Sequence, residues 1–382
     1  NQVSHSIKIK NPMSFNKYLP IFIIILTPTF LFAQNKNLNY NKFKQLKEEI
    51  APPNVFRTAS GAPGHEYYQN EADYEMSITL NDQEQKITGS ETIKYHNNSP
   101  DKLEYLWIQL DQNKRAQNSD SYKIETSNFN PIDKKSINKV LNYFELQELG
   151  SELNFQEDTI WNLNERTIKN MNPEFEGGFN IMKVINKDGK PLSYTIHQTM
   201  MRINLEKPLK PKESFEFSID WWYNINDRLK IGGRSGYEYF EKDGNYLYTI
   251  AQFYPRMCVY NDTEGWQNKQ FLGSGEFTLP FGDYDVKITV PSDHVVAATG
   301  ELVNADEILT PLQLERLEKA RESEKEPVFI VNEKEAIKNE KSVVKAMKIW
   351  HYKAENVRDF GWASSRKFIW DAMVVRQASK DV

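Results

Sequence analysis

The amino-acid sequence predicts a mainly β protein, arranged as an antiparallel β-sandwich or a curved antiparallel sheet. Short segments in which apolar and polar residues alternate recur along the chain, and turn residues separate them. Hydrophobic residues make up 39% of the 382 residues and aromatic residues 13%, which is enough apolar material for a sizeable core. Short alternating strands at this spacing are typical of sheets that bury one face.

The N-terminus has the pattern of a secretory signal peptide. Three lysines precede an apolar run over Leu19–Phe32, and the small residue Ala33 follows it. A membrane-spanning helix needs roughly 20 apolar residues, so an uncleaved membrane anchor is the less favoured alternative. We therefore expect residues 1–33 to be upstream sequence and signal peptide, with cleavage after Ala33. The mature protein is expected to be periplasmic or extracellular and to have no membrane partner.

Charge and cysteine content exclude some classes of function. A net charge of −5 gives no reason to expect binding to nucleic acid or to an anionic membrane. Cys258 is the single cysteine, so an intrachain disulfide and a cysteine-ligated metal cluster are both excluded. We expect its thiol to be packed in the core.

Strands begin after a polar lead-in arm. The arm covers residues 34–72 and includes a short helical pattern near Phe43–Ile50. Apolar residues then alternate with polar ones over Tyr74–Leu80 and Ile87–Tyr95, on both sides of a polar turn, which predicts a β-hairpin. Leu103–Leu110 is the next expected strand, with Leu106 and Ile108 facing inward.

Two stretches interrupt the strand pattern. Residues 111–176 are polar, with a helical pattern near Ile137–Leu149, and we interpret them as an insertion or long excursion from the sheet. Residues 304–341 are rich in Glu and Lys, with leucines at helical spacing, which predicts a solvated surface helix between two strands. Between and after these stretches we expect strands at Phe179–Ile185, Leu192–Ile196, Met200–Leu205, Ser214–Tyr223, Tyr246–Phe253, Phe277–Val290 and Val343–Tyr352.

The last segment has a different pattern. Apolar residues in Val357–Trp370 recur at roughly helical spacing. One amphipathic helix cannot bury its apolar face alone. We therefore expect residues 354–382 to be the first helix of a second, α-rich domain that is truncated here.

A search for catalytic motifs finds no complete site. No histidine has a second histidine four positions later, and the nearest mimic of a zinc-peptidase motif, His65–Gln69, is expected to be a loop. Spacing alone leaves a Ser/His/Asp arrangement open, but no Gly-x-Ser-x-Gly turn exists. The aromatic residues of Trp221–Tyr223 and Tyr237–Tyr248 fit either a β-core or a sugar-binding platform, and the core interpretation is favoured.

One region resembles a known family. Tyr248–Met257 leads to Asp262 and Gly265-Trp266, and a later strand ends in Val290–Gly300. In order and spacing these segments are similar to the N-terminal domain of the aminopeptidase N family of zinc metallopeptidases. Ala354–Ser364 is similar to the segment where such enzymes pass into their catalytic domain. The resemblance covers roughly Tyr74 to Asp371.

The resemblance implies an architecture and two site residues. It implies a saddle-like β-domain over residues 73–353, followed by the start of the catalytic domain at residues 354–382. The family's counterpart of Gln252 lies at the wall of the active-site cleft, near the amino end of the substrate. A carboxylate or glutamine often stands two places later, where this chain has Tyr254. Gln252 and Tyr254 are therefore the candidate substrate-binding residues, and a buried structural strand is the equal alternative for Gln252.

The family's zinc-binding helix and its catalytic residues have no counterpart in this sequence, so no catalytic or metal-binding residue is assigned. The resemblance implies that the parent protein is an exported zinc-dependent aminopeptidase, with a peptide as substrate and zinc as the cofactor of the full-length protein. This segment would bind no zinc, would be inactive alone, and would pack against its own downstream catalytic domain. The alternatives are a β-sandwich binding module for a glycan or a protein, and a family member that has lost its zinc site.

Overall fold

The structure is a computed structural model that describes residues 53–124, 130–131, 161–162, 175–273, 278–342 and 344–376. The expected signal peptide, residues 34–52 of the lead-in arm and the helix expected near Ile137–Leu149 lie outside these ranges. The chain divides into two units, residues 1–67 and 68–382, and the sheets belong to the second.

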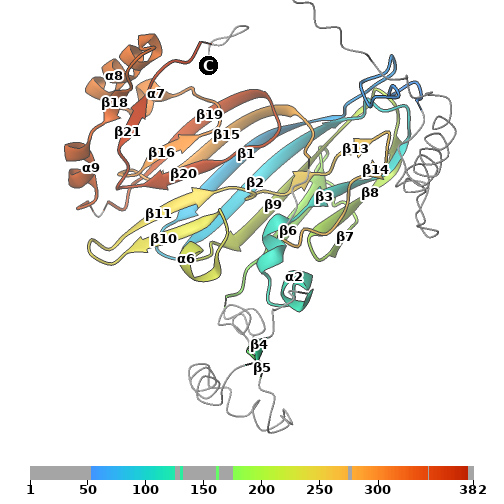
Figure 1. Ribbon diagram of the computed structural model, residues 1–382, viewed down its shortest axis with the longest axis horizontal. Coiled ribbons are helices and arrows are strands. Elements are labelled where there is room, and N and C mark those ends of the chain that lie inside the picture. Colours follow the sequence, from blue (N-terminus) through green and yellow to red (C-terminus); the bar gives the residue numbers. More distant parts are fainter. Residues whose placement is uncertain are drawn as a thin grey trace, which may run out of the picture. The chain divides into compact units, whose positions relative to one another are not determined.

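The largest element is a seven-stranded sheet in the order β17-β19-β15-β1-β2-β9-β6. Its neighbouring strands are antiparallel except for β1 and β15, which run parallel. Figure 1 shows its long strands running side by side. The strands are β1 (Glu71–Asn81), β2 (Lys86–His96), β6 (Asn180–Asn186), β9 (Ser214–Asn224), β15 (Gly282–Pro291), β17 (Glu301–Leu302) and β19 (Met347–Val357).

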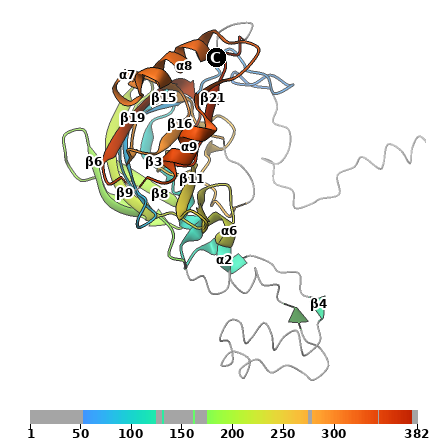
Figure 2. The ribbon, with the colours of Figure 1, turned by 90° about the vertical axis from the view of Figure 1, so that its left-hand side faces the viewer.

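Two four-stranded sheets pack on the inner face of the large sheet (Figure 2). One has the order β10-β11-β20-β16, and the other has the order β12-β3-β8-β7. Their buried apolar residues form one continuous core with those of the large sheet. The strands are β10 (Gly236–Phe240), β11 (Asn245–Ile250), β16 (Val295–Ala298) and β20 (Trp362–Ser365) in the first sheet, and β3 (Leu103–Gln109), β7 (Tyr194–His197), β8 (Met200–Leu209) and β12 (Arg256–Met257) in the second.

The remaining elements are short. Three two-stranded sheets pair β4 (Asn130–Pro131) with β5 (Trp161–Asn162), β13 (Tyr260–Asn261) with β14 (Gly265–Trp266), and β18 (Val328–Val331) with β21 (Trp370–Ala372). The helices are η3 (Asp111–Arg115), α2 (Asp120–Ile124), α6 (Arg228–Ile231), α7 (Ala305–Ile308), α8 (Pro311–Glu322) and α9 (Glu333–Asn339). Within the described ranges, every helix falls short of the length and apolarity that a membrane span needs.

The mainly β fold class is confirmed, and so is the first hairpin. β1 and β2 pair along their whole length, and Tyr74, Met76, Ile78 and Leu80 are each at most 3% exposed. Leu106 and Ile108 of β3 face inward and are fully buried, as expected. The Glu- and Lys-rich stretch between β17 and β19 contains the expected surface helix as α8, which Thr310 caps through a reciprocal capping box with Gln313.

The helix expected at Val357–Trp370 is wrong. β19 continues to Val357, and Trp362–Ser365 form β20, which lies between β11 and β16 and pairs with both. Two neighbouring strands satisfy the backbone of this segment from both sides, and this tertiary pairing outweighs the local helical spacing. Residues 354–372 are thus built into the sheets, and the expectation that a catalytic domain follows stays a prediction.

Candidate functional site

Residues 251–255 join β11 to β12 and contain both candidate substrate-binding residues. β11 ends at Ile250, and the backbone then turns at Gln252, whose φ of 53° is left-handed. The Gln112 side chain donates a hydrogen bond to the Gln252 carbonyl oxygen at 2.8 Å, and the Ala251 N–H donates to the Ser235 hydroxyl at 3.1 Å. A non-glycine residue in this conformation is strained and persists only where its surroundings hold it.

The side chain of Gln252 is half-buried and uncommitted. Its amide makes no hydrogen bond to any residue in the part of the chain that the structure describes. Gln252 lies in a bend rather than in a strand. A primary amide offers two N–H donors and one carbonyl acceptor, so this position holds a rigid backbone with a free hydrogen-bonding group.

Tyr254 has different surroundings. Its side chain is fully buried, and its hydroxyl donates a hydrogen bond to Asp359 Oδ1 at 2.9 Å and lies 3.0 Å from the Tyr284 hydroxyl. Burial raises the pKa of Tyr254 well above its ordinary value, so the hydroxyl keeps its proton and acts as a donor. The role of Gln252 and Tyr254 in substrate binding stays a prediction.

Arg256 anchors this segment through two carboxylates. Its Nε and Nη2 donate to Asp111 Oδ2 at 3.0 and 2.8 Å, and its Nη1 donates to Asp359 Oδ2 at 2.8 Å. Burial lowers the pKa of Arg256, but Asp111 and Asp359 outweigh burial and raise it above its ordinary value. Burial raises the pKa of Asp111 against the pull of the Arg256 guanidinium. We name Asp111, Tyr254, Arg256, Tyr284 and Asp359 the Arg256 cluster.

Sequence reasoning missed the partners of this segment. Asp111 and Gln112 begin the stretch interpreted as an excursion from the sheet, yet η3 places them against residues more than 130 positions later. Asp359 lies in the segment that was expected to be helical. No local pattern marks such long-range partners, although a buried arginine requires acidic partners somewhere in the chain.

The described histidines form no metal site. His65 is an exposed loop residue, as expected, and His96 and His351 each pair with an aspartate on a neighbouring strand, Asp73 and Asp285. Among the residues that the structure describes, no group of three His, Cys, Asp or Glu side chains could hold a metal ion.

One Ser/His/Asp arrangement does occur, but it is buried. His294 Nδ1 lies 2.8 Å from the Ser364 hydroxyl, and its Nε2 lies 3.9 Å from Asp82 Oδ2. Burial lowers the pKa of His294 to about 4. Because Ser364 is fully buried, it is not accessible to a substrate.

The core interpretation of the aromatic residues is confirmed in part, and that of Cys258 is confirmed. Trp221, Tyr223 and Tyr248 are at most 1% exposed and pack in the core, whereas Trp222 is half-buried and Tyr239 is 45% exposed. The thiol of Cys258 is fully buried, 3.9 Å from the sulfur of Met200, and burial raises its pKa.

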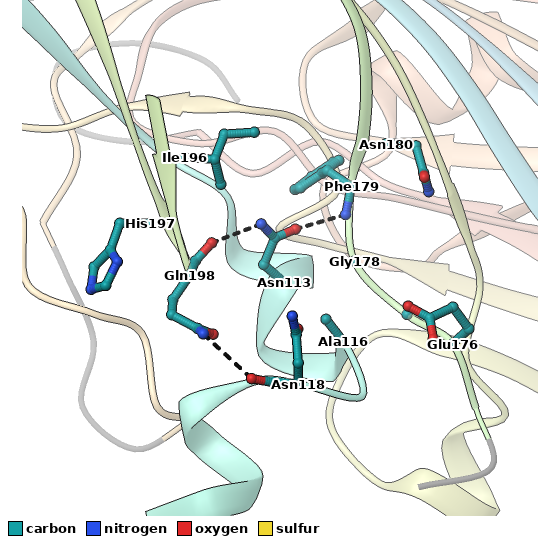
Figure 3. A pocket seen from close by; sticks show the side chains of 11 residues that line it. Asn113, Ala116, Asn118, Glu176, Gly178, Phe179, Asn180, Ile196, His197 and Gln198 are labelled. Carbon is teal, nitrogen blue, oxygen red and sulfur yellow. Dashed lines mark hydrogen bonds between the residues drawn. The ribbon is translucent and has the colours of Figure 1, made fainter. Parts of the chain in front are cut away.

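A pocket of about 380 Å³ lies between the first residues of β6 and the last residues of β7 (Figure 3). Asn113 closes one side of it. Its amide donates to the Gln198 carbonyl oxygen at 2.8 Å and accepts from the Phe179 N–H at 2.7 Å. The lining residues are Asn113, Ala116, Asn118, Glu176, Gly177, Gly178, Phe179, Asn180, Ile196, His197 and Gln198.

Similar solved structures are zinc metallopeptidases. An M1 zinc metallopeptidase from Deinococcus radiodurans matches with 9% identity and a TM-score of 0.35, over 78% of this chain and 42% of that chain. A mutant of it bound to a Tyr-Ser-Ala substrate matches with 10% identity and a TM-score of 0.38, over 82% and 46%. A two-domain M1 zinc metallopeptidase mutant bound to L-tryptophan matches with 10% identity and a TM-score of 0.37, over 84% of this chain and 48% of that chain.

This chain spans less than half the length of those structures. At these scores we carry no residue assignment from them to this chain. No family model matches the sequence, and no curated protein matches it either.

Proposed function

We propose that this chain is the N-terminal β-domain of an exported zinc-dependent aminopeptidase and that the Gln252 turn lines its active-site cleft. One observation carries the proposal. The residue that the aminopeptidase N resemblance singles out has a backbone locked in a left-handed conformation and a side-chain amide with no hydrogen bond to a described residue. Strained backbone conformations that the surrounding structure holds in place occur most often at ligand-binding and catalytic sites.

The chemistry of the amide fits the amino end of a peptide. The carbonyl oxygen of Gln252 would accept a hydrogen bond from the α-ammonium group of the substrate. Tyr254 would act as a positioning residue, because its buried hydroxyl holds Asp359 and so the Arg256 cluster behind the turn. The described residues offer no metal-binding group, so zinc would be bound by other residues of the full-length protein.

Export rests on the N-terminal pattern of lysines, apolar core and small residue. Expression of the whole gene in its own host, followed by cell fractionation, tests it. We expect the protein outside the cytoplasm, with a mature N-terminus near Gln34. An intact N-terminus in the cytoplasmic fraction would contradict export.

Peptidase activity is tested on the full-length protein with aminoacyl nitroanilides that have either a free or an acetylated α-amine. We expect zinc-dependent hydrolysis of the free-amine substrate alone. Gln252→Ala should raise its KM about tenfold or more, because a hydrogen bond to a charged group is lost. Gln83→Ala, which removes an exposed amide from the β1–β2 turn, is the matched control and should leave KM unchanged. Equal kinetics of the two variants would refute the role of Gln252, and no hydrolysis at all would refute the proposed function.

A further inference from the structure

The pocket between β6 and β7 is a prepared site that the proposed peptidase function does not use. β6 and β7 are edge strands, one of the large sheet and one of the second four-stranded sheet. Two inward amides fix the surrounding backbone. Asn113 ties the β7–β8 turn to the start of β6, and Gln198 accepts from the Asp120 N–H at 3.2 Å and donates to the Asn118 carbonyl at 3.3 Å. A backbone held in this way pays little ordering entropy when a ligand enters.

Four other polar side chains around the pocket are not committed to the protein. Asn118, Glu176, Asn180 and His197 are exposed, and in the described ranges their side chains make no hydrogen bond. In Figure 3 Asn118 lies below Asn113, Glu176 and Asn180 lie on the β6 side, and His197 lies beyond Gln198 on the other side, so the four side chains come from three separate segments of the chain. The amides of Asn118 and Asn180 both donate and accept hydrogen bonds, and the carboxylate of Glu176 accepts them. A neutral imidazole has one donor and one acceptor nitrogen. The site therefore offers several donors and acceptors at once.

The charges of the lining residues indicate whether the ligand is anionic or neutral. Among the described residues that line the pocket there is no lysine or arginine, and Glu176 contributes a negative charge. Phosphate and carboxylate ligands are recognised by Arg or Lys or by a helix N-terminus, and here they would meet a carboxylate instead. A neutral ligand with many hydroxyl groups fits better, since each hydroxyl both donates and accepts.

An apolar surface adjoins the polar groups. Ile196 lines the pocket and is 40% exposed, and Tyr194, two residues earlier on the same face of β7, is 37% exposed. A sugar ring presents hydroxyls at its rim and C–H groups on its faces, so polar groups beside an exposed aromatic ring match both. The volume of about 380 Å³ is within the range of small-molecule sites.

From these observations we infer that the pocket binds a neutral carbohydrate, with Asn118, Asn180 and Glu176 hydrogen-bonded to its hydroxyls and the Tyr194–Ile196 surface against its ring. This binding is independent of peptide hydrolysis, because the pocket shares none of its lining residues with the Gln252 turn.

The test is calorimetric titration of the full-length protein with maltose, cellobiose, lactose and N,N′-diacetylchitobiose. We expect at least one disaccharide to bind with a Kd below about 1 mM. The double variant Asn118→Ala/Asn180→Ala should weaken that binding about tenfold or more, since it removes two hydrogen-bonding amides. Asn268→Ala removes an exposed amide outside the pocket and is the matched control, expected to bind like the parent.

Spermidine separates a sugar site from a cation site. A sugar site should tolerate Glu176→Gln within about threefold, because an amide oxygen still accepts, and should not bind spermidine. Binding of spermidine without any disaccharide would overturn the inference. So would the absence of binding by all four disaccharides, or sugar binding that the double variant leaves unchanged.

Discussion

Glu91 gives the sharpest test of the sandwich core. It lies on the inner face of β2, opposite Met76 of β1 and Ile219 of β9, and is 1% exposed. Neither carboxylate oxygen has a hydrogen-bond partner among the described residues. Burial alone raises its pKa well above the ordinary value of 4.5, because an unpaired charge is costly in an apolar interior. The folded protein therefore holds a proton on Glu91 that the unfolded chain releases.

This difference sets the sign and size of the effect. Above about pH 4.5 the unfolded state binds fewer protons at Glu91 than the native state, so stability falls as pH rises. The slope is about 1.4 kcal/mol per pH unit, up to the pKa in the folded protein. Gln is neutral at every pH and nearly isosteric, so Glu91→Gln removes this slope. The variant should gain about 1.4 kcal/mol per pH unit relative to the wild type from pH 5 up to the pKa of Glu91 in the folded protein, which is at most about 2.7 kcal/mol by pH 7.

Urea unfolding of the purified protein and the variant at pH 5, 6 and 7 measures this gain directly. All other titrating groups are shared, so they cancel in the difference between the two proteins. Glu75→Gln changes an exposed carboxylate on the solvent face of β1 and should produce no such drift. A difference between wild type and Glu91→Gln that stays constant within about 0.5 kcal/mol would refute the assignment of a protonated, unpaired Glu91.

Three further substitutions or labels test the packing. Asp111→Ala leaves the Arg256 charge buried without its main partner, so the free energy of unfolding measured in urea should fall by about 3–5 kcal/mol. A loss below about 1 kcal/mol would contradict the ion pair. Gly89→Ala places a Cβ 2.3 Å from the buried ring of Trp221 and should lower the free energy of unfolding by about 1–3 kcal/mol. The tryptophan emission should then be redshifted or broadened. Unchanged stability would mean that the ring can move. The Cys258 thiol should resist Ellman's reagent until the protein is unfolded, and rapid labelling of the native protein would contradict its burial.

The strands could be predicted from sequence because their signal is local. In β1 and β2 one face is buried and the other is solvated, so the alternation of residues over Tyr74–Leu80 reports the fold directly. The hairpin, β3, β9 and the surface helix α8 all follow this logic. The parallel pairing of β1 with β15 could not be predicted, because no sequence pattern states which distant strand becomes a neighbour.

The failures arise where long-range contacts decide the structure. Val357–Trp370 has apolar residues at helical spacing, but β11 and β16 flank Trp362–Ser365 within it on both sides and hold these residues as a strand. Gln252 was found only through the family resemblance. Its left-handed backbone depends on Gln112, which lies 140 residues earlier. A candidate site built by such contacts leaves no periodic trace in the sequence.

The short helix η3 connects the two proposed sites, and this connection can be tested. Gln112 holds the carbonyl of Gln252, whereas the next residue, Asn113, holds the wall of the pocket. The Gln112 side chain also accepts a hydrogen bond from Arg115 Nη1 at 2.9 Å, but Asn113 keeps both of its hydrogen bonds to the pocket wall when Gln112 is replaced. Gln112→Ala should therefore raise the KM for aminoacyl substrates about fivefold or more, because the Gln252 turn loses its restraint, and should leave disaccharide binding intact. Asn113→Ala should weaken disaccharide binding by a similar factor and leave the KM intact. If each variant instead impaired both activities equally, η3 would act as a single structural unit, and the two sites would not be independent.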